Sequence, residues 1–168
     1  MATLVVGVGN EDRGDDGLGP LAARLLACAW AADPPDGIEV IAWTGDPLGL
    51  LDVWAGYERL VLIDAVVSGA EPGTCRRFGP DAPFAKPSAT SSHGLGLAEA
   101  LELARALGRA PAGVEVWGIE AAEFAAGAPM TPAVARAVLA LVERLREELV
   151  AEAAAGAAAG AAAEAPAA

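Results

Sequence analysis

The chain is poor in positive charge and in histidine. Its 168 residues include 11 lysines and arginines against 23 aspartates and glutamates, which gives a formal net charge of −12. A surface this acidic repels the phosphates of nucleic acids and of anionic lipids. We therefore expect no nucleic-acid partner and no membrane partner. His93 is the only histidine, so a site that needs an imidazole has one candidate.

Cysteines are also few, and long uncharged runs are absent. Cys28 and Cys75 have neither a C-x-x-C spacing nor that of a metal site, so we expect two buried, reduced thiols. The longest uncharged runs, 87–98 and 124–135, have 12 residues each, whereas a membrane-spanning helix needs about 20. The first residues lack the basic start of a signal peptide. We expect a cytoplasmic protein that acts as a monomer.

The last residues have no large apolar side chain. Residues 151–168 read AEAAAGAAAGAAAEAPAA and cannot contribute to a hydrophobic core. Alanine allows the preceding helix to continue for a turn or two, whereas Gly156, Gly160 and Pro166 disfavour a stable helix. We predict a folded domain over 1–150 and a disordered, low-complexity tail over 151–168.

Short apolar runs alternate with amphipathic segments along the domain. Apolar runs predict strands at 4–8, 38–43, 60–63 and 114–119, with an edge strand at 74–78. Helical spacing and capping residues predict helices at 16–31, 46–54 and 94–107, and a last helix that begins at 131. This alternation predicts an α/β fold, a three-layer αβα domain with a mostly parallel twisted sheet of about five strands. In such sheets ligands bind at the carboxyl ends of the strands.

Acidic residues crowd the loop after the first strand. Two glycines there, Gly7 and Gly9, suggest a dinucleotide site in which Asp46 would bind the ribose. The dinucleotide motif G-x-G-x-x-G has two residues before its third glycine, whereas four residues separate Gly9 from Gly14 here. Four carboxylates also follow, and two like charges ~4 Å apart cost about 4 kcal/mol at an effective dielectric constant of ~20. A cation is therefore the better ligand. We expect one member of the pair Asp15 and Asp16 to cap the first helix and the other to bind that cation.

Two more candidate ligands lie at the same predicted edge. Asp64 directly follows a buried strand, and His93 opens a helix after a long loop. One imidazole and two carboxylates from three strand-to-helix junctions suit a divalent transition metal, which points to Asp16, Asp64 and His93. Glu120 and Glu123, after the last strand, are secondary candidates. Ser91 and Ser92 have no G-x-S-x-G motif, which argues against a serine hydrolase.

Five short motifs, in this order and at this spacing, resemble the [NiFe]-hydrogenase maturation endopeptidases. They are GVGN at 7–10 with the acids at 15 and 16, IDA at 63–65 with PG at 72–73, SSHGLGL at 91–97, GIE at 118–120 and TPAV at 131–134. The resemblance covers residues 3 to about 145. The sequence departs from the family pattern at 42–46, where AWTGD replaces an Asp-Gly-Gly-Thr-like stretch, and at Ala121, where proline is common.

The resemblance implies a function and a set of site residues. Members of this family remove a C-terminal extension from the hydrogenase large-subunit precursor after nickel has been inserted. The catalytic, metal-contacting triad of the family maps onto Asp16, Asp64 and His93. Nickel would arrive with the substrate, so we expect no tightly bound cofactor. Two alternatives remain open, a nickel-binding maturation chaperone without protease activity and a nucleotide-binding α/β module.

Overall fold

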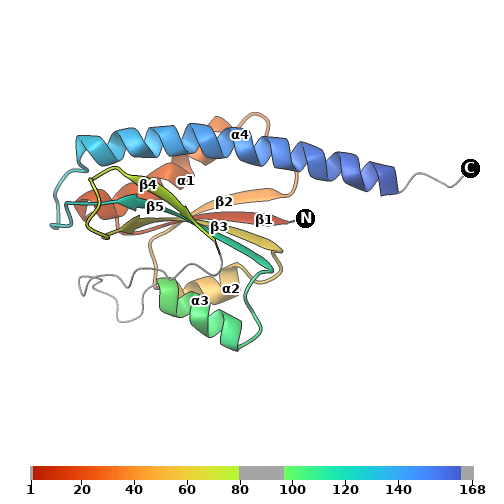
Figure 1. The fold of residues 1–168 in the computed structure, drawn as a ribbon, viewed down its shortest axis with the longest axis horizontal. Coiled ribbons are helices and arrows are strands. Elements are labelled where there is room, and N and C mark those ends of the chain that lie inside the picture. Colours follow the sequence, from red (N-terminus) through yellow and green to blue (C-terminus); the bar gives the residue numbers. More distant parts are fainter. Residues whose placement is uncertain (1, 80–96, 164–168) are drawn as a thin grey trace, which may run out of the picture.

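A five-stranded sheet forms the centre of the molecule, and the computed structural model describes residues 2–79 and 97–163 (Figure 1). The strands are β1 (Thr3–Val8), β2 (Ile38–Trp43), β3 (Arg59–Val66), β4 (Cys75–Phe78) and β5 (Gly113–Glu120). Their order is β2-β1-β3-β5-β4. All neighbouring pairs are parallel except β4 and β5, which are antiparallel. The mostly parallel sheet predicted from the sequence is confirmed.

Helices cover both faces of the sheet. They are the 3-10 turn η1 (Gly14–Gly17), α1 (Leu18–Ala29), η2 (Pro47–Gly49), α2 (Leu50–Val53), α3 (Leu97–Ala106) and α4 (Pro132–Ala163). Helices α1 and α4 lie on one face, and α2 and α3 lie on the other (Figure 1). Because both faces are covered, the parallel strands are mainly apolar, and every residue of β1 is buried. The three-layer αβα architecture is thus confirmed. Within the described residues, no helix is long and apolar enough to cross a membrane.

Alternate residues of each strand face different helix layers. On β3, Val61 and Ile63 pack under α1 and α4, whereas Leu60 and Leu62 pack under α2 and α3. Successive side chains of a strand point to opposite faces, so Asp64 continues the α2/α3 face at the carboxyl end of β3. The Asp64 carboxylate therefore lies on the α2/α3 face, at the end of the sheet where the parallel strands terminate.

The buried face of α1 differs from the predicted one. The sequence spacing indicates a face made by Leu18, Leu21, Leu25 and Cys28, whereas Leu18, Ala22 and Leu26 are the fully buried residues. The reason is a close approach of α1 to β1. A Cβ atom built on Gly7 would lie 1.9 Å from the carbonyl oxygen of Gly19 and 2.9 Å from the Cβ of Ala23, so α1 turns these small residues toward β1.

Both cysteines also depart from expectation. Cys28 and Cys75 are free thiols with exposed side chains, so the prediction of two buried thiols is wrong. Cys28 is exposed because α1 is turned toward β1 by its small residues. Cys75 is exposed because β4 is an edge strand whose residues 75–77 all face solvent at least in part.

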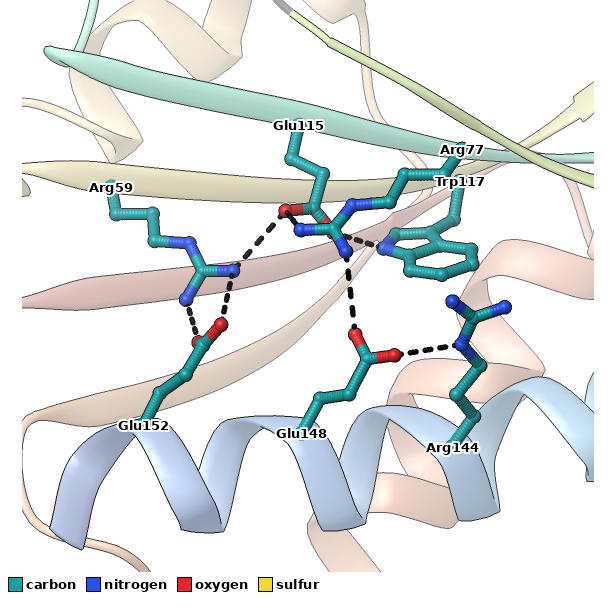
Figure 2. Close-up of polar contacts among 7 residues, drawn as sticks. All are labelled: Arg59, Arg77, Glu115, Trp117, Arg144, Glu148 and Glu152. Atoms are coloured by element: carbon teal, nitrogen blue, oxygen red, sulfur yellow. Dashed lines mark hydrogen bonds and ion pairs between the residues drawn. The ribbon is translucent and has the colours of Figure 1, made fainter. Parts of the chain in front are cut away.

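Helix α4 extends past the predicted end of the domain. Its buried residues recur every three or four positions as expected, from Val134 to Leu149. The helix then continues to Ala163, where the sequence predicts disorder from residue 151, because an alanine-rich segment has a high helix propensity. Glu152 forms an ion pair with Arg59 of β3, and Glu148 with Arg77 of β4 (Figure 2). The division of the chain at residue 150 stays a prediction.

Removal of residues 151–168 should have little effect on stability. No side chain of residues 151–156 belongs to either hydrophobic core, and the Glu152 carboxylate is 43 % exposed. Exposed ion pairs contribute little, so we expect the free energy of unfolding to fall by about 1 kcal/mol or less. Urea unfolding of the chain truncated at residue 150 measures this. A sharply lower midpoint would show that the segment docks on the domain.

Candidate functional site

The start of α1 lies directly on the carboxyl ends of β1 and β3. A Cβ atom built on Gly19 would be 2.2 Å from the carbonyl oxygen of Val8 and 2.5 Å from that of Ile63. Only glycine permits this contact. As a result η1, which carries Asp16, lies next to the end of β3, which carries Asp64. The fold therefore brings these two predicted site residues to one edge of the sheet.

The two carboxylates are held by short backbone contacts. Asn10 N donates a hydrogen bond to Asp16 Oδ2 at 3.2 Å, and Ala65 N donates to Asp64 Oδ1 at 2.8 Å. Both residues are half-buried. Burial, together with the negative charge of Asp16, raises the pKa of Asp64 to about 7. At neutral pH Asp64 is thus divided between its acidic and basic forms, which is the state a proton-transferring group needs.

This shifted pKa predicts how the stability of the protein responds to pH. The folded state holds the Asp64 proton more tightly than an unfolded chain, whose aspartates have a pKa of about 3.9. Wild-type stability should therefore fall as pH rises from about 4 to 7. Asparagine imitates the protonated form, so Asp64→Asn should be more stable than wild type by about 4 kcal/mol at pH 8 and by about 1.5 kcal/mol at pH 5. Urea midpoints at the two pH values measure this difference. An equal difference at both would contradict it.

Asp15 has a structural role that the sequence did not reveal. Its side chain is fully buried and accepts hydrogen bonds from Ala122 N (2.9 Å), Glu123 N (3.0 Å), Thr131 N (2.6 Å) and Thr131 Oγ1 (3.2 Å). Burial alone would raise the pKa of Asp15, but these hydrogen bonds outweigh it and lower the pKa. An ionised Asp15 thus ties η1 to the loop between β5 and α4.

The prediction that Asp15 or Asp16 caps the first helix is wrong. The residue at the N-cap of α1 is Gly17, and no side chain makes a capping hydrogen bond there or at η1. The carboxylate of Asp15 instead accepts hydrogen bonds from residues that lie 107 to 116 positions further along the chain. No local pattern reports a contact of that range, which is why two adjacent aspartates look equivalent in the sequence.

Glu120 and Glu123, the secondary candidates, hold loops. Glu120 is 3 % exposed, and its oxygens accept hydrogen bonds from Ser68 N, Ser68 Oγ and Gly69 N at 2.7–2.8 Å. Burial would raise the pKa of Glu120, but these donors lower it, so the carboxylate anchors the loop after β3. Glu123 is half-buried and accepts from Ala125 N at 2.7 Å. The oxygens of Glu120 are thus engaged inside the protein, whereas Glu123 makes a local contact at the surface.

His93 lies outside the described residues, as do Ser91 and Ser92. Within 2–79 and 97–163, no three histidine, cysteine, aspartate or glutamate side chains gather in a group that could hold a metal ion. The structure thus places two members of the predicted triad together, and the role of the triad stays a prediction.

Asp46, the candidate for a ribose contact, has a local partner. Its Oδ1 accepts a hydrogen bond from Leu48 N at 2.8 Å, and Pro47 occupies the first position of η2. The helical segment that the sequence predicts from residue 46 thus begins with an N-cap aspartate followed by proline. This carboxylate is thereby used to begin η2, which weakens the nucleotide-binding alternative.

Comparison with known proteins identifies the family. A family model described as hydrogenase maturation protease matches residues 29–148. The hydrogenase expression/formation protein HupD of Bradyrhizobium diazoefficiens is 29 % identical over 134 residues, which cover 78 % of this chain and 69 % of HupD. The structure is similar to the hydrogenase maturating endopeptidase HybD from E. coli, with a TM-score of 0.71 and 27 % identity over 88 % of this chain and 94 % of HybD. It is also similar to the [NiFe] hydrogenase maturation protease HybD from Thermococcus kodakarensis, with a TM-score of 0.67 and 30 % identity over 89 % of this chain and 99 % of that chain. The chain, a peptidase, belongs to the hydrogenase maturation protease family.

Proposed function

We propose that this peptidase removes the C-terminal extension of a [NiFe]-hydrogenase large-subunit precursor after nickel has been inserted. The observation that carries the proposal is the pair Asp16 and Asp64 at the carboxyl edge of the sheet, where ligands of parallel α/β folds bind. Family membership supports the reaction class. We further propose that the enzyme works as a monomer in the cytoplasm, without a nucleic acid or a membrane.

The triad would read the metal that the substrate carries. Asp16, Asp64 and His93 supply two carboxylates and one imidazole, a ligand set suited to a divalent transition metal. Nickel held mainly by cysteine thiolates of the precursor would complete its coordination through these side chains. This contact would fix the scissile peptide bond beside a polarising cation. The enzyme then needs no tightly bound metal of its own.

Two routes can deliver the hydrolytic water. In one, the substrate's metal activates the water. In the other, Asp64 accepts a proton from a water as it attacks the carbonyl carbon, and the same proton then passes to the leaving amine as the C–N bond breaks. The second route requires an Asp64 carboxylate that does not ligate the metal during proton transfer, because a bound cation would lower its pKa from the value of about 7 that burial gives it.

A nickel-binding chaperone would use the same three side chains without cleaving a peptide bond. Membership in a protease family favours the peptidase interpretation. Nickel titration of the free protein separates the two functions, since a chaperone has to bind the ion tightly. We expect weak binding to the protein alone.

Incubation with a nickel-loaded large-subunit precursor tests the proposed function. We expect a large subunit shortened at its C-terminus and one released peptide, both identified by intact mass. The variant Glu123→Gln, whose carboxylate accepts a local hydrogen bond from Ala125 N within the described residues, should process the precursor at the wild-type rate. A precursor left intact by correctly folded wild-type enzyme would contradict the proposal.

A further inference from the structure

Strand β4 presents an open edge. Within the described residues it pairs only with β5, because it is the last strand of the sheet order. Glu120 N donates to the carbonyl oxygen of Thr74 at 2.9 Å, and hydrogen bonds of an antiparallel pair alternate along the strand. The backbone groups of Cys75 and Arg77 therefore point outward. Among residues 2–79 and 97–163, no strand occupies this outer edge.

Residues paired across three neighbouring strands connect β4 to the candidate site. Asp64 of β3 is paired with Gly118 of β5, and Gly118 is paired with Arg76 of β4. Partners in register point to the same face of a sheet, so Asp64 and Arg76 share the α2/α3 face. With strands about 4.8 Å apart, their Cα atoms lie about 10 Å from each other. The residue between them is Gly118, and the side chains of Val66 and Phe78 close over it, so a chain that joins Asp64 to Arg76 would pass across an apolar surface.

Arg76 and its neighbour Arg77 are used differently. Arg77 points to the α4 face, where its guanidinium contacts Glu115 at 2.6 Å and Glu148 at 3.6 Å and lies over the ring of Trp117 (Figure 2). Arg77 thereby holds β4 to β5 and α4. Arg76 is exposed, and in the part of the chain that the structure describes its side chain makes no hydrogen bond and no ion pair. Its charge is thus available to a ligand on the face that carries Asp64.

The residues around the site are mainly acidic, so the positive charge of Arg76 matters for binding an anionic group. The loop that carries Asp16 also carries Glu11 and Asp12, in a chain of net charge −12. A substrate carboxylate that approaches this edge is repelled unless a cation receives it. Guanidinium binds a carboxylate through two parallel hydrogen bonds, which are stronger than neutral ones.

We propose that Arg76 binds a carboxylate on the peptide segment that the enzyme removes. This inference rests on the proposed function, because it takes the scissile bond to lie at Asp64. An extended chain advances about 3.3 Å per residue, so it crosses the 10 Å from Asp64 to β4 in about three residues. The carboxylate therefore belongs to a residue about three positions after the cleaved bond, either as an acidic side chain or as the end of a short extension.

Kinetics with Arg76→Gln test the assignment. We expect the KM for nickel-loaded precursor to rise by about tenfold or more, as for the loss of one charge-assisted hydrogen bond, while kcat stays within about twofold. Arg76→Lys should recover part of the loss. The control is Arg136→Gln on α4, which removes another exposed arginine for which no ion pair is described and should leave KM unchanged.

Changes in the precursor identify the carboxylate. One set of precursors carries amides in place of the acidic side chains of the extension, and another carries a C-terminal carboxamide. The change that removes the partner of Arg76 should raise KM for wild-type enzyme and have no further effect on Arg76→Gln. An unchanged KM for Arg76→Gln, or equal effects of every precursor on both enzymes, would overturn the assignment. If wild-type enzyme leaves the nickel-loaded precursor intact, the proposed function fails instead.

Discussion

Replacement of Asp64 by asparagine should leave the protein folded and reduce processing of nickel-loaded precursor by at least about 100-fold. Asparagine keeps the shape and the acceptor for Ala65 N, but it carries no charge for nickel and cannot take a proton from water. Loss of a general base alone lowers rates by about 10²–10⁴-fold. The same argument predicts that Asp16→Asn and His93→Ala lose activity while they fold normally.

Single-turnover processing by the three variants measures this loss, and urea unfolding checks that each is folded. The matched control is Asp12→Asn, which removes one negative charge from the same loop at an exposed position. It should retain wild-type activity, because the described contacts of Asp12 involve its backbone N and O atoms. Full activity of His93→Ala would show that the triad is misassigned.

Asp15→Ala should lower the free energy of unfolding by about 3 kcal/mol. The substitution leaves the donors of Ala122, Glu123 and Thr131 without their acceptor, and a buried group without its partner costs about 1–3 kcal/mol. Because the pKa of Asp15 is lowered in the folded state, its contribution is present above pH 4 and is lost as the pH falls further. The two proteins should therefore become closer in stability at acid pH.

Urea unfolding at pH 7 and at pH 3 measures the effect of Asp15→Ala. Asp33→Ala is the control, since Asp33 is exposed in the turn after α1 and should change stability by about 0.5 kcal/mol or less. A difference below 1 kcal/mol at pH 7 would show that the loop between β5 and α4 does not depend on Asp15.

Periodic patterns in the sequence predicted most of the fold. The predicted apolar face of α4 recurs at helical spacing and is buried as expected, with the residues Val134, Val138, Leu141, Val142, Leu145 and Leu149. The strands near 4–8, 38–43, 60–63 and 114–119 appear with boundaries that differ by at most a few residues. These elements are predictable because burial of a helix stripe or of a parallel strand leaves a local pattern in the chain.

Other features depend on contacts that have no local pattern. The hydrogen bonds of Asp15 and Glu120 join residues 51 to 116 positions apart, so the sequence could not separate these anchors from Asp16 and Asp64. The buried face of α1 depends on the close approach of Gly7 and Gly19, which overrides the spacing of its leucines. The sequence thus predicted that acidic side chains gather at the carboxyl ends of the strands, but it did not predict which hydrogen-bond donors each carboxylate contacts.

The most direct measurement compares nickel-loaded and nickel-free precursor of identical sequence with the same enzyme, which has been treated with a chelator and freed of it. If Asp16, Asp64 and His93 read a metal that the substrate carries, the treated enzyme should cleave the loaded precursor at its original rate. The nickel-free precursor should stay intact, because the acidic edge has no cation through which to position the peptide. Efficient cleavage of nickel-free precursor by this enzyme would contradict the mechanism and indicate a peptidase that depends on its carboxylates alone.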